Sequence, residues 1–416
     1  MGTIHALTFD EDWNVVEDEV IETLDEGLTL GITYDPESTP DNVILWISHS
    51  SPHVYGGQIN SSVITRLSGP NHSVREDIIT GLPRANANHA INGIHFGTDG
   101  RLYIAVGSNT GTGAPHGTTG EFGDRPEQPL SAALLVADVK SPTFQGECAT
   151  PLYEFGIPEA CDVSVFSSGL RNMYDFTVHS NGYLYGPNNG LGVEGTVPPS
   201  AEAPCTGLAD LETDNPGAQG DSLYLLEEGN YYGHPNPYRD ECVFGDGTFQ
   251  GVDPLPNYTP AIWDLGLNRS ADGIIEYDGD VACGALDGDL LITNYSVGDS
   301  VTRVQALRGW ALGGPCRQPG HRVRRPAADR PGTEWRVLRG RVWRLAGHDR
   351  HPAGTGVLGE RGAAAGREAR GGRRRDRRHR LRGGRQGRLR PVQRGARVRL
   401  RGRHLDRGRP AARRGG

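Results

Sequence analysis

One pattern recurs along the first three-quarters of this 416-residue chain: an apolar strand, a polar turn that contains glycine, and a second apolar strand. The clearest copy spans residues 93–107, with Asp99-Gly100 at its centre. Asp-Gly and Asn-Gly dipeptides favour tight hairpin turns, because both residue types tolerate positive φ. Further copies lie at residues 30–47, 174–186 and 273–293, with Asn181-Gly182 and Asp287-Gly288 as turns in the last two.

Such repeated hairpins, joined by long loops rich in glycine and proline, favour a β-propeller. Helical periodicity is nearly absent from this part of the sequence, so we expect an all-β fold. Propeller blades usually run to about 40–50 residues, and with loops this long we expect about five blades' worth of chain. The spacing of the copies is too uneven to fix the number of blades.

Charge divides the chain into two parts at Thr302. Residues 1–302 contain 9 Lys and Arg against 44 Asp and Glu, a net charge of −35, whereas residues 303–416 contain 34 Arg against 7 Asp and Glu, a net charge of +27. Self-repulsion on this scale destabilises a compact fold unless salt screens it. With Lys140 as its only lysine, the acidic part is typical of a protein adapted to high salt; an ordinary acidic extracellular protein is the alternative.

The basic part, residues 303–416, has the composition of a frame-shifted translation. It contains no Ser, Asn, Ile, Phe, Tyr, Lys or Met, and a slip of reading frame in a GC-rich gene produces such a sequence. We expect this tail to be disordered or non-native. The alternative is a nucleic-acid-binding tail, for which the densest Arg stretch, 371–380, lacks the aromatic residues that stack on bases. We therefore expect no nucleic-acid partner.

The six cysteines suggest an exported protein. None forms a C-x-x-C pair, which argues against zinc, while Cys148 with Cys161 and Cys205 with Cys242 are plausible disulfides. No apolar run is long enough to span a membrane. The chain opens as if inside a strand, so we expect a secreted protein whose signal peptide and first strands are missing.

Polar residues next to the repeated strands are the candidate site residues, because in a propeller the loops that join strands meet at one face. His89 precedes the second strand pair and Ser108 follows it. Arg171 and Asn172 precede the next pair, and Gly190 follows that pair. We expect these loops to converge on one cavity, with His89 and Arg171 facing each other across it.

Several segments, in a consistent order over roughly residues 20–300, resemble the glucose/sorbosone dehydrogenase family. The most specific are His89 with Phe96-Gly-Thr-Asp-Gly-Arg-Leu-Tyr103, Gly169-Leu-Arg-Asn172, and Gly229-Asn-Tyr-Tyr-Gly-His-Pro235. The last is similar to the family's Gly-x-Asn-Tyr-Gly-Trp-Pro. The chain looks closest to a divergent branch of this family, whose soluble members use pyrroloquinoline quinone and calcium.

The resemblance implies a role for five residues. His89 matches the histidine that takes the hydroxyl proton of the sugar as hydride leaves to the quinone, a task suited to an imidazole. Arg171 and Asn172 match the pair that contacts the quinone. The carbonyls of Gly190 and Leu191 match those that bind calcium. The residues alone leave an alternative for each role. His89 is then a loop histidine, Arg171 and Asn172 tie adjacent loops, and Gly190 and Leu191 form an ordinary turn.

Two positions depart from the family pattern. A glutamine of the cofactor site falls on Glu26, and the aspartate that orients the catalytic histidine falls on Ser108. The basic cofactor ligands of the last blades have no counterparts after residue 302. These departures put the activity in doubt more than the fold.

Together these observations predict two segments. Residues 1–302 form a partial six-bladed β-propeller, incomplete at both ends, and residues 303–416 form an Arg/Gly-rich tail. The predicted function is quinone-dependent oxidation of a sugar or polyol, with pyrroloquinoline quinone and calcium as cofactors. The alternative is a non-catalytic extracellular propeller that binds protein or glycan. The sequence does not indicate an oligomeric state.

Overall fold

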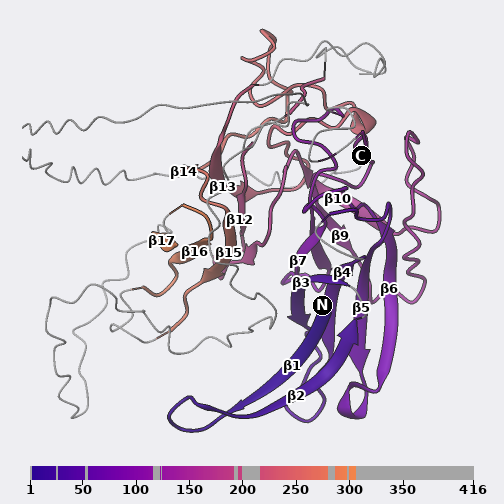
Figure 1. Cartoon of the computed structure of the whole chain (residues 1–416), viewed down its shortest axis with the longest axis vertical. Helices are drawn as coiled ribbons and strands as arrows, with labels where there is room; N and C mark the ends of the chain where they lie inside the picture. Colours follow the sequence, from indigo (N-terminus) through magenta and orange to yellow (C-terminus); the bar gives the residue numbers. More distant parts are fainter. Residues whose placement is uncertain are drawn as a thin grey trace, which may run out of the picture. The chain divides into compact units, whose positions relative to one another are not determined.

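A computed structural model describes residues 2–24, 27–51, 55–115, 122, 124–191, 195–198, 216–279, 286–297 and 299–305 (Figure 1). All of them belong to one compact unit, Met1–Gly347. Apart from two 3₁₀ turns, Pro70–His72 and Pro237–Arg239, their regular structure is entirely β. In this described part no helix is long and apolar enough to cross a membrane.

Four antiparallel sheets follow one another along the chain, each with its strands in sequence order. The first contains β3 (Leu28–Tyr34), β4 (Leu45–Ser50), β5 (Ser62–Ser68) and β6 (Val74–Leu82). The second contains β7 (Ile91–Phe96), β8 (Leu102–Val106), β9 (Ala133–Ala137) and β10 (Val163–Ser168). The third contains β11 (Thr177–Val178), β12 (Leu184–Asn188), β13 (Gly220–Leu226) and β14 (Trp263–Leu267). The fourth contains β15 (Ala271–Glu276), β16 (Leu290–Asn294) and β17 (Ser300–Val304).

These sheets are the blades of a β-propeller. The first strand of each blade contacts the next blade: β3 contacts β7, β7 contacts β11, and β11 contacts β15. A meander whose first strands adjoin one another is the blade arrangement of a propeller. The predicted all-β propeller is thus confirmed, with four blades in the described residues where the sequence predicted about five blades' worth of chain.

The predicted hairpin turns are also confirmed. Gly100 joins β7 to β8, Gly182 joins β11 to β12, and Gly288 joins β15 to β16. Their φ values are 81°, 86° and 76°, in the left-handed region that favours glycine. These local signals identified the first two strands of three blades.

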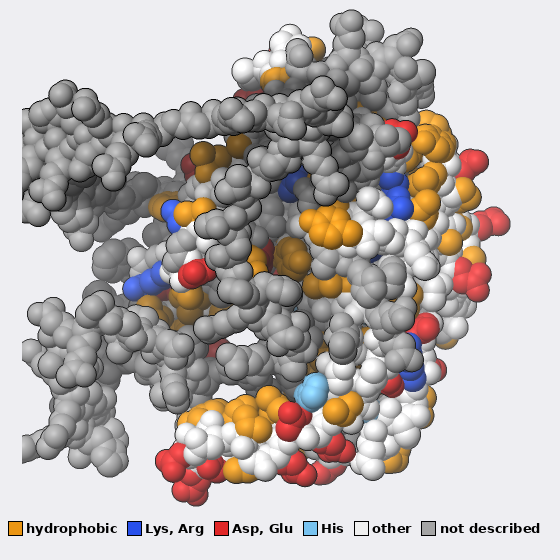
Figure 2. Space-filling view, in the orientation of Figure 1, with side chains coloured by type: hydrophobic (Ala, Val, Ile, Leu, Met, Phe, Trp, Pro, Cys, Tyr) orange, Lys and Arg blue, Asp and Glu red, His pale blue; other side chains and the backbone are white. Residues whose placement is uncertain are grey.

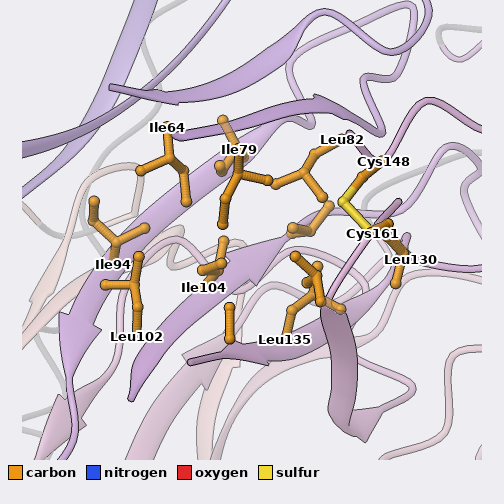
Figure 3. Packing of buried hydrophobic residues seen from close by; sticks show 14 of the residues in the cluster. Ile64, Ile79, Leu82, Ile94, Leu102, Ile104, Leu130, Leu135, Cys148 and Cys161 are labelled. Carbon is orange, nitrogen blue, oxygen red and sulfur yellow. A yellow bond between two sulfur atoms is a disulfide. The ribbon is translucent and has the colours of Figure 1, made fainter. Parts of the chain in front are cut away.

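The hydrophobic cores lie between neighbouring blades. Alternate side chains of β8 face opposite ways: Leu102 and Ile104 pack against the first blade, whereas Tyr103 and Ala105 pack toward the third. Figure 3 shows the first of these cores, in which Ile64 and Ile79 lie opposite residues of the second blade. A third core joins the last two blades through Tyr185, Leu223, Leu265, Ala271, Ile274, Leu290 and Ile292.

The hairpin formed by β1 (Gly2–Phe9) and β2 (Val15–Leu24) packs on the first blade. Ile4 and Leu24 of the hairpin form a cluster with Leu45, Ile47 and Leu67, which point away from the first inter-blade core. The hairpin therefore covers the outer face of this blade.

The space-filling view in Figure 2 shows acidic side chains along the rim of the molecule, with only scattered basic ones.

The predicted disulfide between Cys148 and Cys161 is present, with 4.8 Å between its Cα atoms. Cys242 is disulfide-bonded as well, whereas Cys205 lies outside the described residues, so the predicted pairing of these two stays a prediction. Strand β17 crosses the predicted boundary at residue 302 by two residues. The rest of the predicted tail, from residue 306, also lies outside the described residues.

Candidate functional site

A cavity of about 390 Å³ lies at one end of the third blade. Asn188, Ser222 and Asp264, which are paired across β12, β13 and β14, line its floor. The loops at 169–171 and 233–234 form another part of its wall. The cavity thus lies where the second strand of the blade ends, which is the end at which the sequence predicted the site.

Glycines line part of this cavity, at points where backbone segments approach each other closely. Gly169 and Gly233 both have positive φ, and a Cβ on Gly169 would come within 2.6 Å of the Gly233 nitrogen. A Cβ on Gly233 would lie 2.9 Å from the Cα of Gly245. Four aromatic residues also line it: Tyr224, Tyr232, Phe244 and Tyr258. A lining that combines glycines with aromatic residues suits a planar ligand.

Arg171 is fixed by carbonyl groups at the edge of the cavity. Its Nε donates to the Gly111 carbonyl and its Nη1 to the Gly190 carbonyl, each at 3.1 Å. Its guanidinium also lies 5.6 Å from the ring centroid of Phe122. The side chain places a permanent positive charge beside the cavity, where an anionic group of a ligand would be favoured.

Asn172 is buried and connects loops. Its backbone N–H donates to Asn188 Oδ1, and its Nδ2 donates to Asn189 Oδ1 at 3.3 Å. Its Oδ1 accepts from Asn92 Nδ2 at 3.0 Å. Asn188 and Asn189 line the cavity, so Asn172 supports two lining residues from behind. These contacts match the alternative in which Asn172 ties adjacent loops.

His89 is only 2% exposed and is not among the residues that line the cavity. Its Nδ1 lies 3.0 Å from both the carbonyl and the hydroxyl oxygen of Ser108. Because the Ser108 hydroxyl donates to Thr110, the His89 Nδ1–H is the donor to Ser108, which leaves Nε2 without the proton. The ring packs on Phe122, with 4.6 Å between the centroids.

Burial, and then the positive charge of Arg171, holds the pKa of His89 well below 6.5. A carboxylate would oppose both effects, but Ser108 occupies the position where the family resemblance places one. His89 is therefore neutral at physiological pH. As a base it is weaker than an ordinary histidine.

The two carbonyls predicted to bind calcium already have hydrogen-bond donors. Gly190 accepts from the Arg171 guanidinium, and Leu191 accepts from the Gln219 N–H at 2.8 Å. A cation at Gly190 would lie beside the positive charge of Arg171. No group of three His, Cys, Asp or Glu residues that could hold a metal occurs in the described part of the chain. The residues present therefore do not fit a calcium ion at this position.

The predicted loops nevertheless meet. The Ser108 N–H donates to the Arg171 carbonyl at 2.8 Å, and the charge of Arg171 acts on His89. Both His89 and Arg171 also contact the ring of Phe122, so they lie on the same face of the propeller. Glu26, predicted at the same face, lies outside the described residues.

The structure adds two residues that the sequence did not single out. His234 lines the cavity, and its Nε2 lies 3.0 Å from Oε1 of the buried Glu127. His234 stands where the family block has tryptophan. This departure from the family block could have identified His234 as a candidate site residue. Glu127 is 107 positions away in the sequence and belongs to no motif, so nothing local indicated the pair.

No protein-family model and no curated protein matches this chain. Among solved structures, it is similar to the putative oxidoreductase (glucose dehydrogenase) of Thermus thermophilus, with 18% identity and a TM-score of 0.43 over 74% of this chain and 78% of that one. It is also similar to the holo form of the PQQ domain of pyranose dehydrogenase from Coprinopsis cinerea, with 13% identity and a TM-score of 0.43 over 69% and 65% of the two chains. At these identities and scores the likeness assigns no ligand or activity to this chain, and the β-propeller rests on its own strand order and blade contacts.

Proposed function

We propose that this chain is a quinone-dependent oxidoreductase that oxidises a sugar or polyol in the cavity of the third blade. The observation that carries the proposal is a cavity whose lining combines glycine residues, four aromatic residues and the fixed guanidinium of Arg171. Pyrroloquinoline quinone is planar and anionic, and these residues fit both properties. When bound, such a quinone supplies a two-electron acceptor.

Arg171 would hold an anionic edge of the quinone, and Asn172 would support Asn188 and Asn189 beneath it. The resemblance proposes His89 as the base. However, His89 is buried, packs against the ring of Phe122 and is not among the residues that line the cavity. Calcium has no part in this proposal, because the Gly190 carbonyl already accepts a hydrogen bond from Arg171.

The disulfide of Cys148 and Cys161 supports a secreted protein, since such bonds persist in oxidising compartments.

Titration of the purified full chain with pyrroloquinoline quinone, followed by quenching of tryptophan fluorescence, tests the proposal. We expect saturable binding that Arg171→Gln weakens at least about tenfold, since charge-assisted hydrogen bonds contribute about 1.5–3 kcal/mol. Arg101→Gln is the matched control, because Arg101 pairs with Asp99 in a surface turn and does not line the cavity. Reduction of dichlorophenolindophenol with D-glucose or sorbitol then measures turnover.

A non-catalytic binding propeller remains the second candidate. The observation in its favour is Ser108, which leaves His89 without a carboxylate partner. Failure of the quinone to bind, together with binding of a glycan or protein by the same chain, would favour this second function.

A further inference from the structure

Glu127 is a fully buried carboxylate surrounded by hydrogen-bond donors. Its Oε2 accepts from the Asn109 N–H at 3.0 Å and from the Ser131 hydroxyl. Its Oε1 accepts from the N–H and the hydroxyl of Thr110, at 3.0 and 2.6 Å, and from His234 Nε2 at 3.0 Å. Five donors from four residues therefore converge on one carboxylate.

These donors keep Glu127 ionised. Burial alone would raise its pKa, but the hydrogen bonds from His234 and from the hydroxyls of Ser131 and Thr110 hold the pKa below its ordinary value. An ionised carboxylate can only accept hydrogen bonds, so His234 Nε2 must carry the proton that it shares with Glu127. In the neutral ring, Nδ1 then has the free lone pair.

His234 is 4% exposed and lines the same cavity as Arg171. Within the described part of the chain, its Nδ1 has no hydrogen-bond partner. A buried imidazole that is fixed in one tautomer by a carboxylate, with its lone pair available at a ligand cavity, has the arrangement of a general base.

Two other histidines, His89 and His95, provide a contrast. His89 has a serine in place of the carboxylate and does not line the cavity. His95 does pair with a carboxylate, since its Nε2 lies 2.8 Å from Asp175 Oδ1, but this pair is partly exposed and lies outside the cavity lining. Of these histidines, only His234 combines a carboxylate partner with access to the cavity.

We propose that His234, positioned by Glu127, is the proton acceptor of this cavity. In the oxidation of an alcohol, which rests on the function proposed above, the hydroxyl proton passes to His234 Nδ1. The carbon-bound hydrogen leaves with its electron pair to a quinone-class oxidant, and the C–O bond becomes a carbonyl. Two electrons and one proton thus reach the oxidant, and one proton reaches the protein.

The first test needs no turnover. In the full chain labelled with ¹⁵N-histidine, the ring signals of His234 are assigned by their loss in His234→Asn. In the wild type we expect the Nε2–H tautomer of His234. In Glu127→Gln we expect the Nδ1–H tautomer to become populated. Addition of D-glucose to the wild type should shift the Nδ1 signal. A wild-type Nδ1–H tautomer, or signals that respond to neither change, would overturn the proposal.

The second test measures dye reduction by the chain loaded with pyrroloquinoline quinone. We expect His234→Asn to lower kcat by about 100-fold or more, the usual contribution of a general base, with quinone binding retained. Glu127→Gln should lower kcat with little change in KM, whereas His95→Gln, the matched control, should stay within about twofold. Turnover of His234→Asn near the wild-type rate would overturn the role of His234.

The two proposals fail separately. A wild-type chain that binds no quinone and reduces no dye, but shows the expected tautomers and the response to D-glucose, contradicts the oxidoreductase function and leaves the Glu127–His234 pair standing. An active wild type with an active His234→Asn variant contradicts the pair and leaves the oxidoreductase function standing.

Discussion

His89 makes the stability of the protein depend on pH. Its folded-state pKa lies well below 6.5, so between pH 6.5 and that lower value the unfolded chain takes up a proton that the folded chain does not. Stability is therefore complete above pH 6.5 and falls as the pH decreases. We expect the melting temperature, followed by circular dichroism from pH 8 to pH 5, to decline less steeply in His89→Gln than in the wild type. Parallel declines would contradict a neutral, buried His89.

The contribution of Asp272 to the stability of the protein has the opposite dependence on pH. Burial, and then the nearby Asp221, raises its pKa to about 6, although hydrogen bonds from Ser270 and Asn189 favour the charged form. Since this folded-state value exceeds the ordinary 3.8, its contribution to stability is present at low pH and is lost as the pH rises through 6. Asp272→Asn should raise the melting temperature by about 2–4 °C at pH 8 and leave it unchanged at pH 4. Equal effects at both values would rule out this explanation.

Residues near the repeated strands could be predicted because their position follows from the strand pattern. Arg171 and Gly190 indeed lie at the cavity, and Ser108 does contact His89. Glu127 and His234 could not be predicted as a pair, because their contact joins the connection between β8 and β9 to the connection between β13 and β14, 107 positions apart in the sequence. The packing of His89 against Phe122 likewise depends on a contact between residues far apart in the sequence.

At the scale of elements, the disulfide closes a loop within the segment between β9 and β10. Cys148 and Cys161 are 13 residues apart, and both are buried in that core. A cross-link over a loop of this size contributes about 3 kcal/mol by restricting the unfolded chain. We expect Cys148→Ala/Cys161→Ala to lower the free energy of unfolding in urea by that amount. Dithiothreitol should destabilise the wild type and leave the double variant largely unaffected at this site; a variant as stable as the oxidised wild type would contradict the prediction.

Hairpins with an Asp-Gly or Asn-Gly turn were predictable, since the turn residues and the alternating strands are local signals. Predictions of blade number were less reliable. The outer strands of a blade follow long loops of unequal length, such as the stretch between β8 and β9, and no fixed period marks them. Strand β11 is only two residues long, and its pairing with β12 is enough to form the first strand of the third blade.

For the whole molecule, the net charge of −35 over residues 1–302 predicts a dependence on salt. Carboxylates repel one another over the folded surface, and added ions screen that repulsion. If this charge reflects adaptation to high salt, the melting temperature should continue to rise as KCl is increased from about 0.15 M, where the Debye length is about 8 Å, to molar concentrations. A melting temperature that is flat over this range would favour the ordinary acidic extracellular protein.

The three inter-blade cores described above each contain side chains from two neighbouring blades. Tyr103 belongs to the core that includes Phe176 and Met173, whereas Ile104, one residue later, belongs to the core that includes Ile64. A change of volume at one of these positions can be compensated only within its own core. Across related sequences, substitutions should therefore covary between adjacent blades, and neighbouring residues of a single strand should evolve independently of each other.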